Sequence, residues 1–310
     1  MNRPSALAET VPRYRGRFAP SPTGPLHFGS LVAAVGSYLD ARSQGGDWLV
    51  RIEDVDAPRT VPGAADGILR TLEAFGFTWD GDVVVQSRRL DLYHAALSRL
   101  QLDGYVYPCA CSRSEVAAAT TEPSVDGGLL YPGTCRNGIA EGKAARAWRL
   151  RVPDRECHFV DRVQGESRQH LEREVGDFVL LRADGQYAYQ LAVVVDDALQ
   201  GVNAVVRGVD LLDSTVRQLW LQYCLGLPTP TYAHLPVVVN AAGEKLSKQT
   251  RAAAIDPAHA GEQLASALKF LGHPLPPDLC GAPLVDLWRW AIGAWLIERV
   301  PAVRAVFPGS

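Results

Sequence analysis

The sequence predicts an α/β fold in which a parallel sheet of the nucleotide-binding kind is interrupted by an inserted domain. Three observations favour this fold. Apolar strand patterns and helical patterns alternate over residues 14–102, the order expected of a parallel sheet. Periodicity is lost over residues 105–190, where four of the six cysteines and several glycines and prolines lie. Alternating strand and helix signals then return over residues 191–239.

The first half of the sheet begins at residues 14–20, a short strand that enters a proline-rich turn. Residues 29–42 have the composition of an apolar helix, which Gly45 and Gly46 end. The patterns that follow predict strands over residues 48–52 and 83–85, and helices over residues 62–75 and 89–102.

The second half begins with Leu191–Val195, an unbroken apolar run that predicts a buried strand ending at Asp196 and Asp197. Further strands are predicted at 204–208 and 235–239, a helix at 214–224, and two tail helices at 260–271 and 284–298. We therefore expect four parts. They are the two halves of a Rossmann-type domain (1–104 and 191–255), an inserted domain (105–190) and a helical C-terminal region (256–310).

Composition restricts the function only weakly. The chain has 310 residues, a formal net charge of −3 and no apolar run that could span a bilayer or serve as a signal peptide, so we expect a cytoplasmic protein. Six cysteines in a chain of this kind do not predict a disulfide framework. Mild acidity neither indicates nor excludes a nucleic-acid partner, because a local basic face can coexist with it.

The first candidate site is the turn before the helix at residues 29–42, Ala19-Pro20-Ser21-Pro22-Thr23-Gly24-Pro25-Leu26-His27-Phe28-Gly29-Ser30. A helix N-terminus after a strand suits a phosphate, because its backbone N–H groups and dipole both favour an anion. His27 adds a polar contact, and Gly29 leaves room for a flat base against the backbone. The plain alternative is a proline-rich turn that caps a helix.

The second candidate is Lys245-Leu246-Ser247-Lys248-Gln249, after Ala242-Gly243. Two lysines three residues apart can contact a triphosphate and neutralise the charge on departing pyrophosphate. Taken alone, the segment is better explained as a solvated basic loop.

Together, the two segments resemble the HIGH and KMSKS signatures of class I aminoacyl-tRNA synthetases. Three further segments resemble the glutamyl and glutaminyl branch: Arg17-Phe18-Ala19-Pro20-Ser21-Pro22-Thr23-Gly24, Arg51-Ile52-Glu53-Asp54-Val55-Asp56 and Val206-Arg207-Gly208-Val209-Asp210. The late Lys-Leu-Ser-Lys-Gln, the segment 187–197 and the short tail resemble the glutamyl-Q tRNA(Asp) synthetases, a shortened group within that branch. The resemblance covers roughly residues 14–255 and implies that no anticodon-binding domain follows.

The resemblance assigns roles to residues by their place in these motifs. It implies catalytic roles for His27, Gly29, Lys245 and Lys248, and ATP binding by His27, Gly29, Ser30 and Lys248. It also implies a glutamate pocket made of Arg17, Phe18, Ala19, Pro20, Ser21, Glu53, Tyr189 and Arg207.

The chemistry of three pocket residues agrees with these roles. Arg207, with Arg17 near, can bind a carboxylate through two parallel hydrogen bonds, and this favours glutamate over glutamine. Glu53 can pair with the substrate ammonium group. The plain alternatives are a surface ion pair of Arg207 with Asp210 and a salt bridge of Glu53 with Arg51.

Cys109, Cys111 and Cys135 form the metal candidate. Two thiolates one residue apart and a third in a glycine-rich segment suit a tetrahedral structural zinc site, although three buried or free cysteines explain the spacing equally well. The resemblance implies one Zn²⁺ per chain with Tyr131 as the fourth ligand. The other cysteines, Cys157, Cys224 and Cys280, are expected to be buried apolar residues.

The expected activity is ATP-dependent activation of L-glutamate to glutamyl-adenylate, with Mg²⁺ on the phosphates. The resemblance implies that glutamate is then transferred to queuosine at the wobble position, with the tRNA(Asp) anticodon stem-loop as partner. A monomer with no membrane partner is expected. Three alternatives are kept: a truncated glutamyl-tRNA synthetase that charges a 3′ end, a small-molecule nucleotidyltransferase or ligase, and a non-catalytic glutamate-binding regulator.

Overall fold

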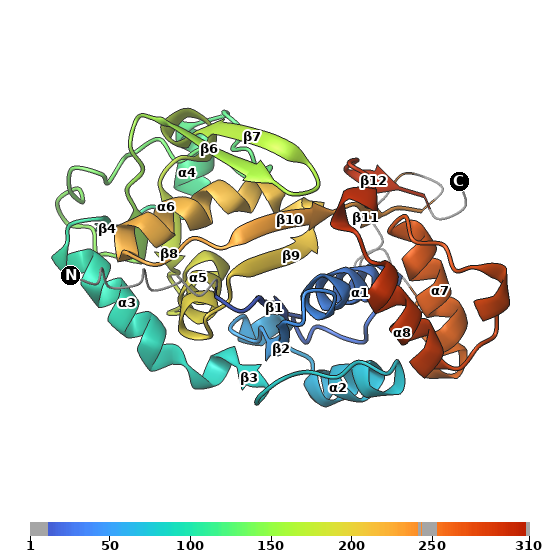
Figure 1. The fold of residues 1–310 in the computed structure, drawn as a ribbon. Coiled ribbons are helices and arrows are strands. Elements are labelled where there is room, and N and C mark those ends of the chain that lie inside the picture. The colour runs from blue at the N-terminus through green and yellow to red at the C-terminus, as the bar shows by residue number, and fades with distance from the viewer. Residues whose placement is uncertain (1–11, 241–242, 244–252, 308–310) are drawn as a thin grey trace, which may run out of the picture.

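The computed structural model describes residues 12–240, 243 and 253–307. Figure 1 shows the arrangement of its helices and strands. In chain order these are β1 (Arg15–Phe18), α1 (Phe28–Arg42), β2 (Asp47–Ile52), α2 (Ala64–Ala74), β3 (Val84–Val85), α3 (Leu90–Leu102), β4 (Val106–Cys109), α4 (Arg113–Ala119), β5 (Ala147–Leu150), β6 (Glu156–Asp161), β7 (Gly165–His170), β8 (Phe178–Leu181), α5 (Tyr189–Leu199), β9 (Ala204–Gly208), α6 (Thr215–Leu225), β10 (Thr231–Leu235), β11 (Val237–Val238), α7 (Ala260–Phe270), α8 (Leu284–Ala294) and β12 (Ala305–Val306).

Two mainly parallel sheets form the centre of the molecule. Their strand orders are β1-β2-β3 and β7-β6-β10-β9, and β7 alone runs antiparallel to its neighbour. β1 and β9 come together where both begin, since the Asn203 N–H donates to the Arg15 carbonyl at 3.1 Å. No ladder pairing joins β1 to β9 in the part of the chain that the structure describes. Among the described strands, the two sheets are therefore not joined by strand pairing at the carboxyl ends of β1 and β9. An open α/β sheet binds its ligand at such a position.

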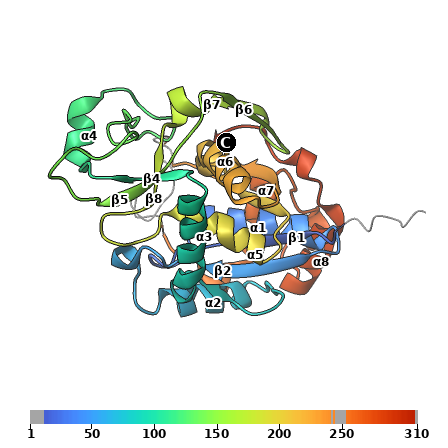
Figure 2. The same ribbon diagram turned by 90° about the vertical axis from the view of Figure 1, so that its left-hand side faces the viewer.

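The segment Leu191–Val195 is helical, so the strand predicted there is wrong. It belongs to α5, and every residue from Leu191 to Asp197 is buried. A short apolar run is compatible with either a buried strand or a buried helix, because both bury all their side chains. α5 lies among α3, α6 and β8 (Figure 2), so no polar face marks its helical period.

The strand predicted over residues 235–239 is displaced. Its first residue is the last of β10, and β11 is a separate two-residue strand that pairs with β12. Pro236 stands between them and has no N–H to donate to a ladder. The two predicted tail helices are confirmed as α7 and α8, although α8 ends at Ala294.

The segment 105–190 contributes to two sheets. β4, β5 and β8 form an antiparallel sheet of their own, whereas β6 and β7 extend the sheet of β9 and β10. Part of this segment is therefore continuous with the core sheet.

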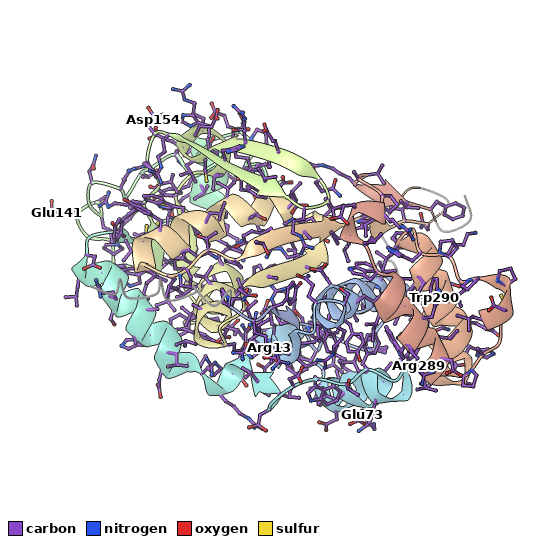
Figure 3. All side chains as sticks on the ribbon, in the orientation of Figure 1. Arg13, Glu73, Glu141, Asp154, Arg289 and Trp290 are labelled. Carbon is purple, nitrogen blue, oxygen red and sulfur yellow. The ribbon has the colours of Figure 1, made fainter. Side chains whose placement is uncertain are left out.

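Aromatic packing joins α8 to α1 and to the segment that follows α2. The Trp288 ring on α8 lies 4.9 Å from both Tyr38 and Phe77, and its indole N–H donates to the Phe75 carbonyl at 2.9 Å. Side chains fill the space between the elements, and Glu141, Asp154 and Arg289 project from the outer ribbons (Figure 3). None of the described helices combines the length and apolarity required to cross a membrane.

Candidate active site

A cleft of about 780 Å³ lies at the carboxyl ends of β1, β2 and β9, against the N-termini of α1 and α5. It contains all eight residues of the expected glutamate pocket, together with His27 and Ser30. The lining consists of Arg17, Phe18, Ala19, Pro20, Ser21, Thr23, Leu26, His27, Ser30, Ala33, Glu53, Arg59, Tyr189, Val206, Arg207, Gly208, Asp210 and Leu211.

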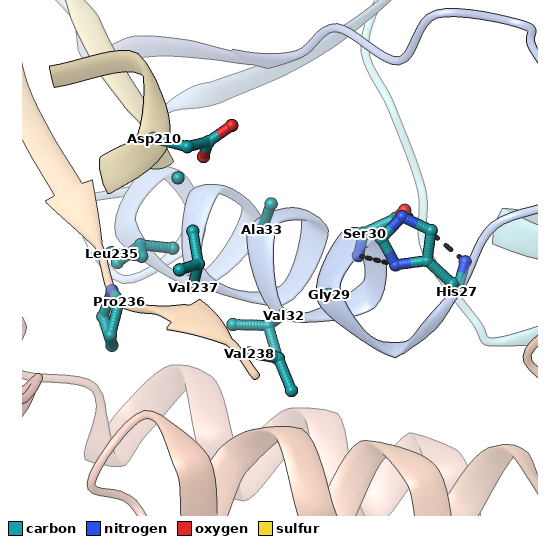
Figure 4. Close-up of a pocket in the computed structure, with 11 residues that line it drawn as sticks. His27, Gly29, Ser30, Val32, Ala33, Asp210, Leu235, Pro236, Val237 and Val238 are labelled. Atoms are coloured by element: carbon teal, nitrogen blue, oxygen red, sulfur yellow. Dashed lines mark hydrogen bonds between the residues drawn. The ribbon is translucent and has the colours of Figure 1, made fainter. Parts of the chain in front are cut away.

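An apolar recess of about 210 Å³ adjoins this cleft and shares with it His27, Ser30, Ala33, Gly208 and Asp210. Figure 4 shows its walls, with Val32 on α1 facing Leu235, Val237 and Val238. Gly29 also lines this recess. Apolar walls beside a helix N-terminus suit a flat heteroaromatic ring attached to phosphates.

His27 is the N-cap of α1, and its side chain has a defined orientation. Its Nδ1 accepts the backbone N–H of Ser30 at 3.3 Å, while the Ser30 hydroxyl accepts the His27 N–H at 3.4 Å. Because Nδ1 is the acceptor, the proton of the neutral imidazole is on Nε2. His27 can therefore donate a hydrogen bond from Nε2 to a phosphate oxygen.

A buried network of charges forms the floor under Glu53. Asp197 of α5 binds Arg17 at 3.1 Å and Arg51 at 2.8 Å, and Arg51 also binds Glu53 at 3.0 Å. Burial would raise the pKa of Asp197, but the charges of Arg17 and Arg51 outweigh it and lower that pKa. For Glu53 burial prevails over the same two arginines, so its pKa is raised. An additional cation at Glu53, such as an ammonium group, would favour its ionised form.

Arg207 is buried, and its described partners carry no charge. Its Nε donates to His234 at 3.0 Å, Nη1 to Gln218 at 2.8 Å and Nη2 to Thr215 at 2.9 Å. Two longer contacts reach Tyr189 at 3.4 Å and the Leu211 carbonyl at 3.3 Å. Among the described residues Arg207 forms no salt bridge, so it is placed to bind an incoming carboxylate.

The sequence left two simpler explanations open, a salt bridge of Glu53 with Arg51 and an ion pair of Arg207 with Asp210, and the structure supports only the first. Glu53 does pair with Arg51, and it also faces the cleft. An ion pair of Arg207 with Asp210 is absent from the described contacts, and both residues line the cleft instead.

Several residues of the cleft were not predicted. Asp210 lay within a recognised motif but received no role, and Arg59, Leu211 and the recess residues 235–238 were missed. The available signal was position, since Leu235 ends a strand that is parallel to β9 and residues 236–238 directly follow it.

Lys245 and Lys248 lie outside the described residues. Residues on both sides of that segment lie beside the cleft. Val238 lines the recess, Ala254 pairs with His27, and the Ile255 N–H donates to the Leu26 carbonyl at 3.0 Å.

Cys109, Cys111 and Cys135 come together beside β4, with their sulfur atoms within 4.8 Å of one another. The Tyr131 hydroxyl lies 3.3 Å from Cys109 and 3.5 Å from Cys111, and Cys111 lies 3.6 Å from Cys135. A tetrahedral zinc with Zn–S bonds of about 2.3 Å requires sulfur atoms roughly 3.8 Å apart. The four groups therefore fit such an ion.

A cation would also change the ionisation of this cluster. Burial raises the pKa of the Tyr131 phenol and of the Cys111 thiol, so both groups favour the protonated form when no cation is bound. Arg149 already supplies one positive charge, since its guanidinium lies 3.8 Å from the Tyr131 ring centroid and donates to Cys109 at 3.4 Å. A bound divalent cation would stabilise the thiolates and the phenolate directly.

Residues 13–263 match the family model described as tRNA synthetases class I (E and Q), catalytic domain. The chain is 65% identical over 288 residues to the glutamyl-Q tRNA(Asp) synthetase of Dechloromonas aromatica (strain RCB), covering 93% of this chain and 96% of that protein. It is 63% identical over 297 residues to the protein of the same name from Chromobacterium violaceum, covering 96% and 98%.

Among solved structures, it is similar to a glutamate tRNA ligase from Elizabethkingia meningosepticum in complex with its amino acid. The TM-score is 0.77 and the identity 25%, over 95% of this chain and 67% of that one. A glutamate-tRNA synthetase from Elizabethkingia anophelis gives a TM-score of 0.76 and 26% identity, over 95% and 68%.

Proposed function

Because the chain belongs to the glutamyl-Q tRNA(Asp) synthetases, within the class I tRNA synthetases for glutamate and glutamine, we propose that it activates L-glutamate with ATP and transfers it to tRNA(Asp). The observation that carries the proposal is one cleft that contains Arg207 and Glu53, runs against the N-terminus of α1 and adjoins an apolar recess. The first pair suits an amino acid with an acidic side chain. The second suits a nucleoside triphosphate.

Glutamate is bound by charge at two ends. Arg207 takes the side-chain carboxylate, and Glu53, held by Arg51, takes the α-ammonium group. Tyr189 forms a wall beside Arg207, and the turn Phe18-Ala19-Pro20-Ser21 encloses the remaining side. Arg17 acts indirectly, because its guanidinium is engaged by Asp197.

ATP occupies the recess and the N-terminus of α1. The apolar walls hold the adenine, with Gly29 beside them, and His27 and Ser30 face the phosphates. Mg²⁺, when bound to the triphosphate, neutralises its oxygens and orients them. Lys245 and Lys248 stabilise the pyrophosphate, a role supported by the position of Val238 and Ala254 on either side of their segment.

Activation needs no protein nucleophile. The α-carboxylate oxygen of glutamate forms a bond to the α-phosphorus, the bond to pyrophosphate breaks, and glutamyl-adenylate remains. Positioning in the cleft and stabilisation of the transition-state charge supply the rate.

Transfer follows when a hydroxyl group of the RNA attacks the carbonyl of the mixed anhydride. A carbon–oxygen bond forms, the bond to AMP breaks, and the hydroxyl proton is released. We propose that the acceptor is queuosine at the wobble position, in the anticodon stem-loop of tRNA(Asp), and that the enzyme acts as a monomer. The names of the relatives support the choice of tRNA.

Cys109, Cys111, Tyr131 and Cys135 are proposed to hold one structural Zn²⁺. The sulfur–sulfur and sulfur–oxygen distances support this assignment. We also propose a division in which residues 105–190 are the inserted domain, residues 1–104 and 191–255 form the catalytic domain, and residues 256–310 are the helical tail.

Position-specific labelling tests the proposed function. The protein is incubated with ATP, radiolabelled glutamate and either tRNA(Asp) containing queuosine or tRNA(Glu), and nuclease mapping then locates the label. We expect label at the wobble nucleotide of tRNA(Asp). Label at a 3′ end would instead support the truncated glutamyl-tRNA synthetase, and no transfer to either RNA would support the glutamate-binding regulator.

Pyrophosphate exchange tests the first step by itself. We expect glutamate-dependent ATP–pyrophosphate exchange without RNA, because the described cleft holds both substrate-binding ends. Lys248→Ala is expected to slow exchange at least ~10-fold, about 1.4 kcal/mol of lost transition-state stabilisation. An absolute requirement for RNA would contradict the first expectation, and an unchanged rate in the variant would contradict the second.

A further inference from the structure

A row of three buried side chains leads away from the cleft behind Arg207. It crosses the neighbouring strands β9, β10 and β6, which carry Arg207, His234 and Asp161 in that order. His234 is the register partner of Arg207, and Asp161 ends β6 beside Tyr232 of β10. The sheet topology therefore places these three residues next to one another although the sequence separates them widely.

Asp161 is the fixed end of the row. One of its oxygens accepts three backbone N–H groups, from Val163 at 3.0 Å, Gln164 at 2.9 Å and His234 at 3.0 Å. The other lies 2.6 Å from His234 Nδ1. Four contacts to a fully buried carboxylate leave it little freedom to move.

His234 is the connecting member, and its tautomer follows from its partners. Its Nε2 receives the Nε–H of Arg207 at 3.0 Å, and arginine can only donate. Nε2 must therefore carry the lone pair, and Nδ1 must carry the proton that is donated to Asp161. Burial, with the charge of Arg207 added, lowers the pKa of His234 to about 4 in spite of the hydrogen bond to Asp161, so the ring is neutral at physiological pH.

Arg207 is held more tightly on one side than on the other. The three short bonds, 2.8–3.0 Å, go to Gln218, Thr215 and His234, none of which lines the cleft. The two long contacts, 3.3 and 3.4 Å, go to Leu211 and Tyr189, which do. One long contact belongs to each terminal nitrogen, so the weakly engaged N–H groups form a fork on the cleft side, as two-point carboxylate binding requires.

The geometry points to His234 and Asp161 as positioning residues that set the orientation of Arg207 and thereby the affinity for the carboxylate of the substrate side chain. Asp161 holds the imidazole, the imidazole accepts the Nε–H, and this acceptor fixes the plane of the guanidinium. Neither residue contacts the substrate. This inference rests on the proposed function, because it takes Arg207 as the residue that binds the glutamate side chain.

Thr215 Oγ1 also lies 3.3 Å from His234 Nε2. Two substitutions at residue 234 separate the contact of the ring with Asp161 from its contact with Arg207. Asparagine places an amide near Nδ1, so His234→Asn keeps a partner for Asp161 and loses the acceptor for Arg207. Glutamine places an amide near Nε2, so His234→Gln keeps the acceptor. In ATP–pyrophosphate exchange we expect His234→Asn to raise the KM for glutamate at least ~10-fold and to leave the KM for ATP within about two-fold. We expect His234→Gln to recover most of this loss.

His273→Asn is the matched control. His273 is also buried, accepts the Leu296 N–H at 3.1 Å and lies outside the cleft. Its replacement should lower the melting temperature without changing the KM for glutamate. A wild-type KM in folded His234→Asn, or equal losses in the Asn and Gln variants, would overturn the inference. Absence of exchange in the wild type, with tRNA present as well as without it, would instead overturn the proposed function.

Spectroscopy decides the matter if His234→Asn does not fold. In protein labelled with ¹⁵N-histidine, His234 is expected to carry its proton on Nδ1, to stay neutral from pH 8 to pH 5 and to change its Nε2 signal when glutamate is added. A proton on Nε2, or an Nε2 signal that does not respond to glutamate, would overturn the inference that His234 positions Arg207.

Discussion

At the scale of single residues, the two arginines of the cleft differ in their partners. Arg17 is neutralised by Asp197, whose two oxygens both accept from it. Arg207 is surrounded by uncharged acceptors among the described residues. An anionic side chain therefore gains more at Arg207, where it supplies the missing counter-charge, than at Arg17.

Replacing Arg207 should abolish productive glutamate binding. Arg207→Leu removes the partner of a desolvated carboxylate, and losing one member of a buried ion pair costs about 3 kcal/mol or more, over ~100-fold in affinity. We expect the KM for glutamate in pyrophosphate exchange to rise by at least that factor while ATP binding is retained. Arg217→Leu is the control, because Arg217 is equally buried but contacts Ser124 and Asp126 outside the cleft. A wild-type KM in Arg207→Leu would show that the pocket is assigned wrongly.

The ionisation of His234 should also be visible in the stability of the protein. The ring titrates near 6.5 in the unfolded chain, and in the folded chain burial lowers its pKa to about 4. Protonation therefore favours unfolding. The stabilisation is complete above pH 6.5 and is lost as the pH falls toward 4, by ~3 kcal/mol in total.

The measurement is the free energy of unfolding in denaturant at several pH values for the wild type and His234→Asn. The variant should lose part of the decline between pH 6.5 and pH 4, since it has no ring to protonate there. Curves of equal slope over that interval would contradict the lowered pKa.

The residues that line the cleft could largely be predicted from sequence motifs. The buried residues that orient them could not. The residues from Arg17 to Ser21, with Glu53, Tyr189 and Arg207, were placed in one pocket by motif resemblance, and all line the same cleft. His234 and Asp161 were missed because they come from strands far apart in sequence and only sheet order makes them neighbours. In the sequence, a single histidine does not indicate which distant residues it will contact in the fold.

At the scale of elements, α5 shows what an apolar run leaves undecided. Its predicted strand would have placed Asp196 and Asp197 on opposite faces. As a helix, α5 places Tyr189 at its first turn and Asp197 two turns later, so that one reaches Arg207 and the other Arg17 and Arg51. The run is apolar on all sides because neighbouring elements cover it. Which elements cover it cannot be read from the segment itself, so the segment alone does not distinguish a helix from a strand.

Asp40 shows how one helix is tied to distant elements. Its carboxylate is buried on α1 and accepts from Tyr14, from both terminal nitrogens of Arg162 and from Trp295 at 3.3 Å. These partners lie before β1, after β6 and after α8, so three separate parts of the chain meet at this residue.

Asp40→Asn should therefore destabilise the fold without altering the cleft. The amide loses the charge that Arg162 pairs with, and charge-assisted hydrogen bonds of this kind contribute about 2 kcal/mol. The expected result is a lower denaturation midpoint with an unchanged KM for glutamate. Asp154→Asn, an exposed carboxylate, is the control and should leave the midpoint almost unchanged. An unchanged midpoint in Asp40→Asn would show that the other donors suffice.

At the scale of the whole molecule, the cysteine cluster and the cleft belong to different sheets. Cys109 ends β4, in the antiparallel sheet of β4, β5 and β8, whereas the cleft lies at the ends of β1, β2 and β9. A zinc with four protein ligands has no open position for a substrate. Its effect on the reaction must then be indirect, through the order of the segment that it holds.

Loss of the metal should accordingly separate the two partial reactions. Purified wild-type protein is expected to contain about one zinc per chain, and Cys111→Ser to lose it, as elemental analysis will measure. Without the metal the segment 105–140 loses its cross-link, while the cleft keeps Arg207, Glu53 and His27. We expect transfer of glutamate to RNA to fall by ~10-fold or more and pyrophosphate exchange to change by less than about three-fold.

Cys157→Ser provides the matched control, because Cys157 is half-buried on β6 and lies outside the cluster. It should keep both the zinc and both reactions, which separates loss of metal from loss of a thiol. Wild-type protein without zinc would remove the metal site. A Cys111→Ser protein that loses zinc and slows equally in both reactions would support the metal site. It would also show that the order of segment 105–140 affects the cleft, and the pairing of β6 with β10 could transmit such an effect.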